Sequence, residues 1–488
     1  MSIRPAKSDK KALSSFDQKL FNTDVEITGV SINAAEVKSG DLFIALPGAK
    51  THGMNFIDQA ISNGAVAVLS DRKIDCSIPV FVDQTPRKLV GPISDWLYDK
   101  PFSKLVAMGV TGTNGKTTTS NLVKQLWDLN NINSGLIGTL GVEIGVEKIA
   151  GVRTTPEADE LQALVAVMAE RGSTHLAMEV SSIALDQSRV SGAKYKVVAF
   201  SNLSQDHLDY HKSMDQYFNA KAKLFTSEYA ESAVINVDDS YGKKLYEICG
   251  ITTKTVSRND KNADWYYSKI QPLTDGFEVE ISDKDSQIIS GKFPLIGEHN
   301  LDNLLLAIAS VRICGLTNTQ ISTSINRLKS VPGRLEVISA GQSFSAIVDY
   351  AHTPDAVSRV LESVRSFTTG RVIGILGCGG ERDVSKRSPM GHALFSGSDL
   401  AIFTSDNPRS EQPEEILKEM TKGIDLAEKG FIYIDRKDAI NFGVKIAKSG
   451  DCLLLMGKGH EIGQEINGEI TPFDDRIELL KSIQQVVK

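Results

Sequence analysis

The segment from Leu105 to Leu129 constrains the fold of this chain more than any other. Its first part, Leu105 to Val110, is a continuous apolar run, which is typical of a strand buried in a parallel sheet. A glycine-containing loop follows, and apolar side chains then recur at helical spacing as far as Leu129. A strand, a loop and a helix in this order predict an α/β domain with an anion-binding turn where the helix begins.

Strand-like and helix-like segments alternate along the rest of the chain as well. A small α/β unit lies between Val25 and about Pro101, and the last third repeats the pattern with apolar runs that begin at Phe344, Val372, Leu400 and Leu453. Because 488 residues are enough for about three domains, we predict an α/β protein with three of them. These are a small N-terminal α/β domain (1–103), a central P-loop-type ATPase domain with a mostly parallel sheet (104–335) and a C-terminal Rossmann-like α/β domain (336–488).

The composition excludes several classes of protein. With 54 Lys and Arg against 61 Asp and Glu, the net charge of −7 argues against a sequence-independent nucleic-acid binder. The five cysteines are odd in number and contain no CxxC pair, so neither a disulfide framework nor a zinc site is expected. The segment from Met1 to Leu20 is polar and rich in lysine, so no signal peptide is expected, and no apolar run approaches the roughly 20 residues that span a bilayer. We therefore expect a soluble, cytoplasmic protein without a membrane span.

The loop after the first apolar run has the residues of a phosphate-binding turn. Its backbone N–H groups can surround phosphate oxygens, Lys116 can reach the β- and γ-phosphates, and the Thr117 hydroxyl can bind Mg²⁺. The common spacing would place a glycine at position 110, where this chain has Val110, and an ordinary helix N-terminus is the alternative interpretation. The expected nucleotide-binding residues of the loop are Gly112, Thr113, Asn114, Gly115, Lys116, Thr117 and Thr118.

This form of the loop resembles that of the Mur ligases and of their relative folylpolyglutamate synthetase. Seven further segments are similar to Mur ligase blocks and occur in the same order: 178–182, 202–211, 297–303, 331–336, 348–355, 406–409 and 457–461. The resemblance is closest to the branch that adds the third residue of the peptidoglycan stem peptide. It implies an ATP-dependent ligase that activates a carboxylate as an acyl phosphate, with ATP and Mg²⁺ as cofactors.

The resemblance also implies the catalytic residues. Lys116 and Thr117 would hold the phosphate side, while Glu179 and His207 would bind a second Mg²⁺. Because Mg²⁺ prefers oxygen ligands, the role of His207 follows from the resemblance alone.

One lysine is expected to be modified. Lys221 matches a lysine that is N6-carboxylated in the family, and the resulting anion would be a further Mg²⁺ ligand. The neighbouring Lys223 is the less favoured alternative, and two solvated lysines on a helix would be the interpretation without the resemblance.

The same comparison implies contacts to both large ligands. Asn303 would contact adenine, Arg334 and Asp349 would contact phosphate and ribose, and His352 could also face the nucleotide. The UDP-N-acetylmuramoyl dipeptide substrate would lie along Thr154, Thr155, Ser181, Gln187 and Arg189.

The amino acid to be added is expected to be meso-diaminopimelate. Compared with lysine it carries an additional distal carboxylate, for which Arg409 offers a bidentate cation, while Arg382 would bind the other carboxylate. The expected site consists of Arg382, Asp406, Asn407, Arg409, Gly457 and Glu461, the last two at the distal ammonium group. Ligation of L-lysine, a folylpolyglutamate-synthetase-like ligase and a catalytically inactive nucleotide-binding relative are the alternatives.

Two segments depart from the family pattern. The chain has Asn33-Ala34-Ala35 where Asp-Ser-Arg is usual near the uridine, and Ile183-Ala184 where His-Gly is usual after Ser182. The pattern therefore leaves the uridine contacts and the geometry around Ser182 open, with His52 as a candidate nucleotide contact. We expect the protein to be a monomer whose partners are its small-molecule substrates, with no nucleic acid among them.

Overall fold

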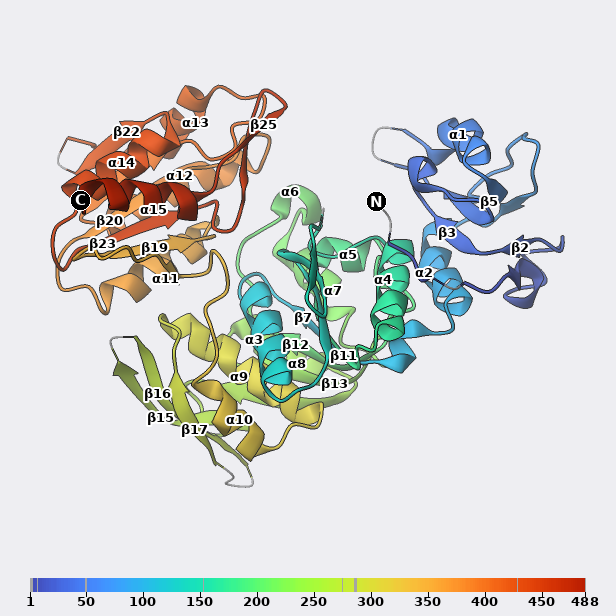
Figure 1. Cartoon of the computed structure of the whole chain (residues 1–488), viewed down its shortest axis with the longest axis horizontal. Coiled ribbons are helices and arrows are strands. Elements are labelled where there is room, and N and C mark those ends of the chain that lie inside the picture. Colours follow the sequence, from blue (N-terminus) through green and yellow to red (C-terminus); the bar gives the residue numbers. More distant parts are fainter. Residues whose placement is uncertain are drawn as a thin grey trace.

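The computed structural model describes residues 3–6, 8–48, 51–151, 153–273, 275–284, 288–427 and 429–487. Figure 1 shows an N-terminal α/β part in blue, a central part in cyan to yellow and a C-terminal part in orange to red. Each part is built around its own mainly parallel sheet. The predicted three-domain α/β fold is confirmed.

The N-terminal sheet is small and wholly parallel. Its strands lie in the order β3 (Gly29–Ser31), β4 (Asp41–Ala45), β5 (Ala65–Ser70) and β6 (Val80–Val82). A separate antiparallel pair is formed by β1 (Lys11–Ala12) and β2 (Glu26–Ile27). Helices cover both faces: α1 (Ile57–Ser62) packs with one apolar cluster and α2 (Pro86–Leu97) with another.

The central sheet has eleven strands among the described residues, seven of which run parallel to one another. These are, in spatial order, β8 (Ser134–Gly138), β11 (His175–Glu179), β7 (Val106–Thr111), β12 (Tyr195–Phe200), β13 (Ala230–Asn236), β14 (Thr252–Ser257) and β15 (Trp265–Leu273). Antiparallel strands extend the two edges: β9 (Gly141–Ile144), β10 (Glu147–Ile149), β16 (Gly276–Asp283) and β17 (Ile288–Phe293).

Apolar helix faces cover both sides of this sheet. One core contains residues of α3 (Lys116–Leu129), α9 (Glu298–Ile313) and α10 (Asn318–Ile325). The other contains residues of α4 (Ala158–Glu170), α5 (Ser182–Asp186), α7 (Met214–Ala222) and α8 (Ser240–Ile248), and the short α6 (Leu208–His211) adjoins α7. The register pairs Glu179 with Val110 and Phe200 with Thr111, so three strands end side by side. Loops that follow these strands therefore meet at one edge of the sheet.

The C-terminal sheet has six strands in the order β18 (Glu336–Val337), β19 (Ser345–Asp349), β23 (Cys452–Met456), β20 (Val372–Leu376), β21 (Leu400–Thr404) and β22 (Gly430–Tyr433). All are parallel except β18. One face is covered by α11 (Pro354–Arg365), α12 (Arg387–Gly397) and α13 (Pro413–Met420), the other by α14 (Arg436–Ile446) and α15 (Asp475–Val486). A hairpin of β24 (Gly463–Ile466) and β25 (Glu469–Pro472) follows β23.

Within the described residues, no helix combines the length and the apolar character needed to cross a bilayer.

Candidate active site

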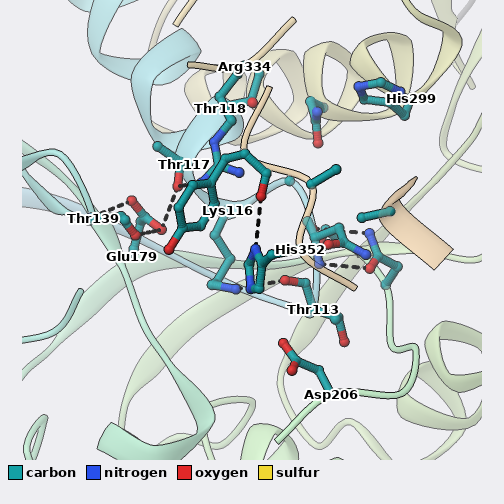
Figure 2. A pocket seen from close by; sticks show the side chains of 18 of the residues that line it. Thr113, Lys116, Thr117, Thr118, Thr139, Glu179, Asp206, His299, Arg334 and His352 are labelled. Carbon is teal, nitrogen blue, oxygen red and sulfur yellow. Dashed lines mark hydrogen bonds between the residues drawn. The ribbon is translucent and has the colours of Figure 1, made fainter. Parts of the chain in front are cut away.

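A cavity lies between the carboxyl edge of the central sheet and the start of the C-terminal part (Figure 2). The central part contributes the loop after β7 and residues that follow β11 and β12, and the C-terminal part contributes residues around the end of β19. Predicted site residues that line it are Thr113, Asn114, Gly115, Lys116, Thr117, Thr118, Thr154, Glu179, Ser181, His207, Lys221, Asn303, Arg334, Asp349 and His352. Residues from segments far apart in the sequence thus meet in one space.

The loop after β7 is wrapped closely around its own lysine. Lys116 begins α3, and its Nζ donates to the carbonyl oxygens of Gly112 and Thr113, both at 2.9 Å. Gly115 has φ +88°, and a Cβ built there would lie 2.2 Å from Asn303 Oδ1. Burial lowers the pKa of Lys116, against the attraction of the nearby Glu179 carboxylate. The loop is therefore compact, with a cation at its centre and backbone N–H groups at a helix N-terminus, which suits an anion.

Hydroxyl and carboxylate oxygens form a compact cluster beside this loop. Thr117 Oγ1 donates to Glu179 Oε2 at 3.0 Å, and it accepts a bond from Arg334 Nη2 at 3.1 Å. Thr139 holds the same carboxylate through its N–H (2.8 Å to Oε1) and its hydroxyl (3.1 Å to Oε2). The Arg334 guanidinium lies over the Tyr350 ring, 4.5 Å from its centroid. A cation from the C-terminal side thereby reaches the phosphate loop.

This oxygen cluster can bind a divalent cation only if a bound ligand supplies further oxygen atoms. The described residues contain no group of three or more His, Cys, Asp or Glu side chains arranged to hold a metal ion. Thr117 and Glu179 offer oxygen ligands, which is the chemistry that Mg²⁺ requires, and Mg²⁺ in nucleotide sites commonly uses one or two carboxylates plus substrate phosphates. The donors present therefore fit Mg²⁺ that arrives with a nucleotide.

Lys221 is buried at the floor of the cavity. Its side chain is 1% exposed, its Nζ donates to Gly112 O at 2.8 Å, and it lies over the Tyr217 ring at 4.6 Å. Burial, reinforced by the Lys116 cation, lowers the pKa of Lys221 well below its ordinary value. Lys223 instead lies outside this cavity with a half-exposed side chain that pairs with Asp186 at 2.9 Å.

His207 precedes α6 with a left-handed backbone (φ +51°). Its Nε2 lies 3.4 Å from Asp206 Oδ2. Burial lowers the pKa of His207 to about 4, and the Lys116 cation acts in the same direction, whereas Asp206 opposes the change. The imidazole is therefore neutral near pH 7, which is the form that can bind a metal. Lys386, from the C-terminal part, forms an ion pair with the same Asp206.

The residues predicted to contact the nucleotide are held by other protein groups. Asn303 Oδ1 accepts from Thr119 Oγ1 at 3.4 Å, and Asn303 Nδ2 donates to Asn300 at 3.1 Å. The Asp349 carboxylate accepts the backbone N–H groups of Leu335 (2.8 Å) and Ala351 (2.7 Å), and burial raises its pKa. In this structure Asp349 therefore anchors the entry into the C-terminal part.

A strip of polar side chains extends from Glu179 along α5. Thr155 Oγ1 donates to Glu179 O at 3.0 Å and accepts the Ser181 N–H at 3.1 Å. Further along, Arg189 Nη2 donates to Gln187 Oε1 at 2.6 Å. Thr154 is thus linked to the carboxylate of Glu179 through Thr139, and Thr155 and Ser181 adjoin the backbone of Glu179, whereas Gln187 and Arg189 form a separate pair beyond α5.

The two departures from the family pattern have clear local structures. Ile183 and Ala184 belong to α5, which Ser181 caps, and Ser182 Oγ is hydrogen-bonded to His211 Nε2 at 2.9 Å. In the N-terminal part, Asn33 caps a short 3₁₀ turn through Ala35 N at 3.1 Å. His52 is engaged through both ring nitrogens, with Met54 N at 3.0 Å and with Asp71 at 3.1 Å.

A second cluster gathers the residues predicted for the amino acid, at the carboxyl ends of β21 and β23. Asn407 Nδ2 donates to Glu461 Oε2 at 2.8 Å. Arg409 Nη1 donates to Gly380 O at 2.5 Å, and Arg409 Nε lies 3.3 Å from Glu465 Oε2. Three further residues were predicted for this cluster: Arg382, Asp406 and Gly457. Arg382 has an exposed side chain and lies in the loop after β20. Asp406 and Gly457 lie close together, since a Cβ built at Gly457 would be 2.6 Å from Asp406 Oδ2.

Sequence reasoning missed four residues that these contacts make important: Thr139, Lys386, Asp206 and Lys458. Asp206 and Lys458 lie within segments that were already singled out, next to His207 and Gly457. A completely buried lysine such as Lys458 has no signature of its own in the sequence. Thr139 and Lys386 depend on packing between distant segments.

Comparison with known protein families accounts for most of the chain. Three models match: "Mur ligase family, catalytic domain" over residues 26–88, "Mur ligase middle domain" over 110–311 and "Mur ligase, glutamate ligase domain" over 333–459.

Full-length relatives are similar as well. The UDP-N-acetylmuramoyl-L-alanyl-D-glutamate–2,6-diaminopimelate ligase of Streptomyces avermitilis is 44% identical over 95% of this chain and 93% of that protein. The protein of the same name from Aquifex aeolicus is 39% identical over 92% of each.

Solved structures of Mur ligases and of a folylpolyglutamate synthase are similar to this chain in fold. A structure of a UDP-N-acetylmuramoyl-L-alanyl-D-glutamate–2,6-diaminopimelate ligase has a TM-score of 0.71 and 31% identity, and covers 98% of this chain and 100% of that one. A folylpolyglutamate synthase of Mycobacterium tuberculosis complexed with ADP has a TM-score of 0.60, 17% identity and 76% coverage of this chain (92% of that chain). At this identity it shows the shared fold alone.

Proposed function

The chain belongs to the Mur ligase family, and from this premise we propose that it adds meso-2,6-diaminopimelate to UDP-N-acetylmuramoyl-L-alanyl-D-glutamate with release of ADP and phosphate. The observation that carries the choice of amino acid is the cluster of Asn407, Arg409 and Glu461, which lies beyond the ends of β21 and β23, the two strands that flank β20. Relatives at 37–44% identity are named as ligases of this amino acid. The product is a precursor of peptidoglycan.

The proposed reaction has two steps. A carboxylate oxygen of the D-glutamate residue attacks the γ-phosphorus of ATP, the bond to the bridging oxygen breaks, and ADP leaves. The amine of the incoming amino acid, after loss of a proton, then attacks the acyl carbon, and phosphate departs as the amide forms. Positioning and charge neutralisation supply most of the rate enhancement in such phosphoryl transfers.

The geometry supports placing the phosphates at the loop after β7. Lys116 and the N-terminus of α3 would bind phosphate oxygens, in place of the Gly112 and Thr113 carbonyl groups that Lys116 now contacts. Arg334, at the junction of the central and C-terminal domains, reaches the same point and provides a planar cation suited to phosphate. Thr113, Asn114, Gly115, Thr117 and Thr118 would complete the loop, and Asn303 would lie at the adenine.

Mg²⁺ fits beside Thr117 and Glu179, and when bound it would neutralise charge on the transferred phosphoryl group. We propose that a second Mg²⁺ is bound by Glu179, His207 and N6-carboxylated Lys221. As an ammonium group Lys221 cannot bind a cation, but its buried setting favours the neutral amine, which is the form that reacts with CO₂. Carboxylation would convert this group into an oxygen ligand.

We further propose a division of labour among the three domains. Residues 1–103 would bind the UDP end of the substrate, residues 104–335 would bind ATP and the muramoyl peptide, and residues 336–488 would bind the amino acid. In the last of these, Arg382 would contact one carboxylate and Arg409 the distal carboxylate, while Asp406, Gly457 and Glu461 would surround the distal ammonium group. We propose that the enzyme acts as a monomer in the cytoplasm.

One assay distinguishes the proposed activity from ligation of L-lysine and from an inactive relative. ADP release is measured with UDP-N-acetylmuramoyl-L-alanyl-D-glutamate and either diaminopimelate, L-lysine or no amino acid. The proposed function requires release that depends on diaminopimelate. Preference for L-lysine would identify the other branch, and no release with any acceptor would identify an inactive relative.

Replacement of Arg409 tests the amino-acid site directly. Arg409→Ala should raise the KM for diaminopimelate about 30-fold or more, because a charged hydrogen bond of about 2 kcal/mol is lost. The KM for ATP should stay within about twofold of the wild-type value, since the phosphate loop is in another domain. Unchanged kinetics with diaminopimelate would remove Arg409 from the site.

A further inference from the structure

Lys458 is a buried cation that the mechanism above does not use. It follows Gly457 at the end of β23, and its side chain is 0% exposed. A buried ammonium group is strongly destabilising unless its charge and its donors are matched by partners. The positions of those partners therefore indicate what the residue does.

Within the described residues, the Lys458 ammonium group makes three hydrogen bonds, two of them to members of the amino-acid cluster. Its Nζ donates to Asn407 Oδ1 at 3.1 Å, to Glu461 Oε2 at 3.0 Å and to Gly463 O at 2.8 Å. An ammonium group has three donors, so this set uses all of them. Two of the three acceptors are side chains proposed to meet the amino acid.

These contacts fix the orientation of the Asn407 amide. Its Oδ1 accepts from Lys458 and also from the Glu465 backbone N–H at 3.0 Å, while its Nδ2 donates to Glu461 Oε2 at 2.8 Å. A flipped amide would place N–H groups against two donors. The amide is thus held in one orientation, and the second N–H of Nδ2 remains for a ligand.

Glu461 is held in a complementary way. Its Oε2 accepts from both Lys458 and Asn407, which keeps a carboxylate next to a cation. The side chain is 32% exposed, and among the residues that the structure describes no hydrogen bond is made by its Oε1. Within the described part of the chain, one N–H of Asn407 and one carboxylate oxygen of Glu461 are therefore left for a ligand.

We propose that Lys458 is a positioning residue that arranges Asn407 and Glu461 to recognise a carboxylate and an ammonium group on the same carbon atom. This inference rests on the proposed function and deepens it. The distal end of diaminopimelate has both groups, whereas the distal end of lysine has only the ammonium group. Lys458 accordingly contributes to the choice between the two amino acids without touching either.

The test replaces Lys458 by methionine, which has a similar length and no charge. Lys458→Met should raise the KM for diaminopimelate at least about tenfold, because Asn407 and Glu461 both lose a charged partner. The ratio of kcat/KM for diaminopimelate to that for L-lysine should fall by a similar factor. The KM for ATP should change by less than about twofold, since Lys458 has no contact with the phosphate loop.

Two further variants separate positioning from general stability. Lys458→Gln keeps amide donors without the charge and should give a smaller loss of discrimination, which also provides a foldable variant if methionine is not tolerated. Lys124→Met removes another largely buried lysine, which pairs with Asp128 and Glu143 on the central domain. This control should lower the melting temperature but leave the amino-acid ratio unchanged.

Calorimetry then measures the binding of diaminopimelate to the full chain in the presence of an ATP analogue and the muramoyl dipeptide. A folded Lys458→Met or Lys458→Gln protein with wild-type KM for diaminopimelate and a wild-type amino-acid ratio would overturn the inference while leaving the proposed function intact. Wild-type protein that neither turns over nor binds diaminopimelate would overturn both.

Discussion

Lys221 is the residue whose chemistry depends most on its surroundings. In water a lysine is almost fully protonated near neutral pH, but burial and the neighbouring Lys116 cation lower the pKa of Lys221. A neutral amine can attack CO₂ through its lone pair, and loss of one N–H proton then leaves a carbamate anion. The same pocket that makes the ammonium form costly therefore prepares the group for modification.

Lys221→Arg should abolish this chemistry while keeping a cation in place. Arginine stays charged and cannot form the carbamate, so kcat for ADP release should fall about 100-fold or more, the usual effect of losing one group that stabilises the transition state. Lys223→Arg is the matched control, because Lys223 is half-exposed and pairs with Asp186. Carbon-13 NMR with labelled bicarbonate should show a carbamate signal in wild type and in the control only. Full activity of Lys221→Arg would exclude the modification as a requirement.

At this scale, the sequence predicted the residues that directly follow strands. Lys116 and Glu179 come together because β7 and β11 are neighbours with their carboxyl ends in register. Thr139 and Lys458 could not be predicted, because their roles depend on side-chain contacts that cross from one loop to another. In sequence alone, Lys458 is indistinguishable from a surface lysine.

The junction of the phosphate loop with α3 depends on its contact with α9. Gly115 has a left-handed backbone, and a side chain there would meet Asn303 of α9 at 2.2 Å. Gly115→Ala should lower the free energy of unfolding by about 1–2 kcal/mol from backbone strain. It should also raise the KM for ATP, because the loop or Asn303 must move, and steady-state kinetics at varied ATP concentration measures this.

Gly145→Ala is the control for Gly115→Ala. Gly145 also has a positive φ (+60°), but no atom lies within 4 Å of a Cβ built there. Its alanine variant should therefore show the strain without the change in KM for ATP. Equal KM values for ATP in the two variants would show that the contact between Gly115 and α9 does not affect ATP binding.

Elements were predicted best where apolar runs are continuous. The run from Val372 to Leu376 coincides with β20, since both of its faces are buried. The polar strand β14 and the glycine-containing β8 were not foreseen, because Thr252–Ser257 and Ser134–Gly138 lack a strong apolar pattern and depend on their neighbours for pairing.

Contacts between domains depend on a few charged groups, one of which responds to pH. Asp159 of α4 accepts the backbone N–H of Ile32 in the N-terminal part at 3.1 Å, and burial raises the pKa of Asp159 to about 6. Because the protonated form is favoured in the folded state, this group stabilises the fold below about pH 4. That stability is lost as the pH rises through about 6.

Asp159→Asn should therefore be more stable than wild type at pH 7.5, by on the order of 1 kcal/mol, with the difference disappearing below about pH 4. Urea unfolding at several pH values measures it. Asp58→Asn, at an exposed position on α1, should show no such trend. A variant that is less stable than wild type at every pH would contradict the assignment of the raised pKa.

Lys386 and Asp206 join the central and C-terminal domains through a largely buried ion pair. Lys386→Met should favour more open arrangements, which small-angle scattering without nucleotide would detect as a larger radius of gyration. The kcat should fall about tenfold if the pair contributes a coupling of about 1.4 kcal/mol to closure.

Lys196→Met serves as the control for this change, because Lys196 pairs with Glu231 on the adjacent strand of the same sheet. It should change neither the scattering profile nor kcat. Identical profiles for wild type and Lys386→Met would show that the pair does not hold the domains together.

The amino-acid cluster is built from loops of the C-terminal sheet alone, whereas the phosphate loop belongs to the central sheet. On the proposed assignment, changes at a few loop positions of the C-terminal sheet would alter the choice of amino acid without changing the ATP site. The same separation bears on inhibitor design. On the proposed assignment, a compound bound at the phosphate loop would compete with ATP, whereas one bound at the cluster around Asn407 and Arg409 would compete with the amino acid.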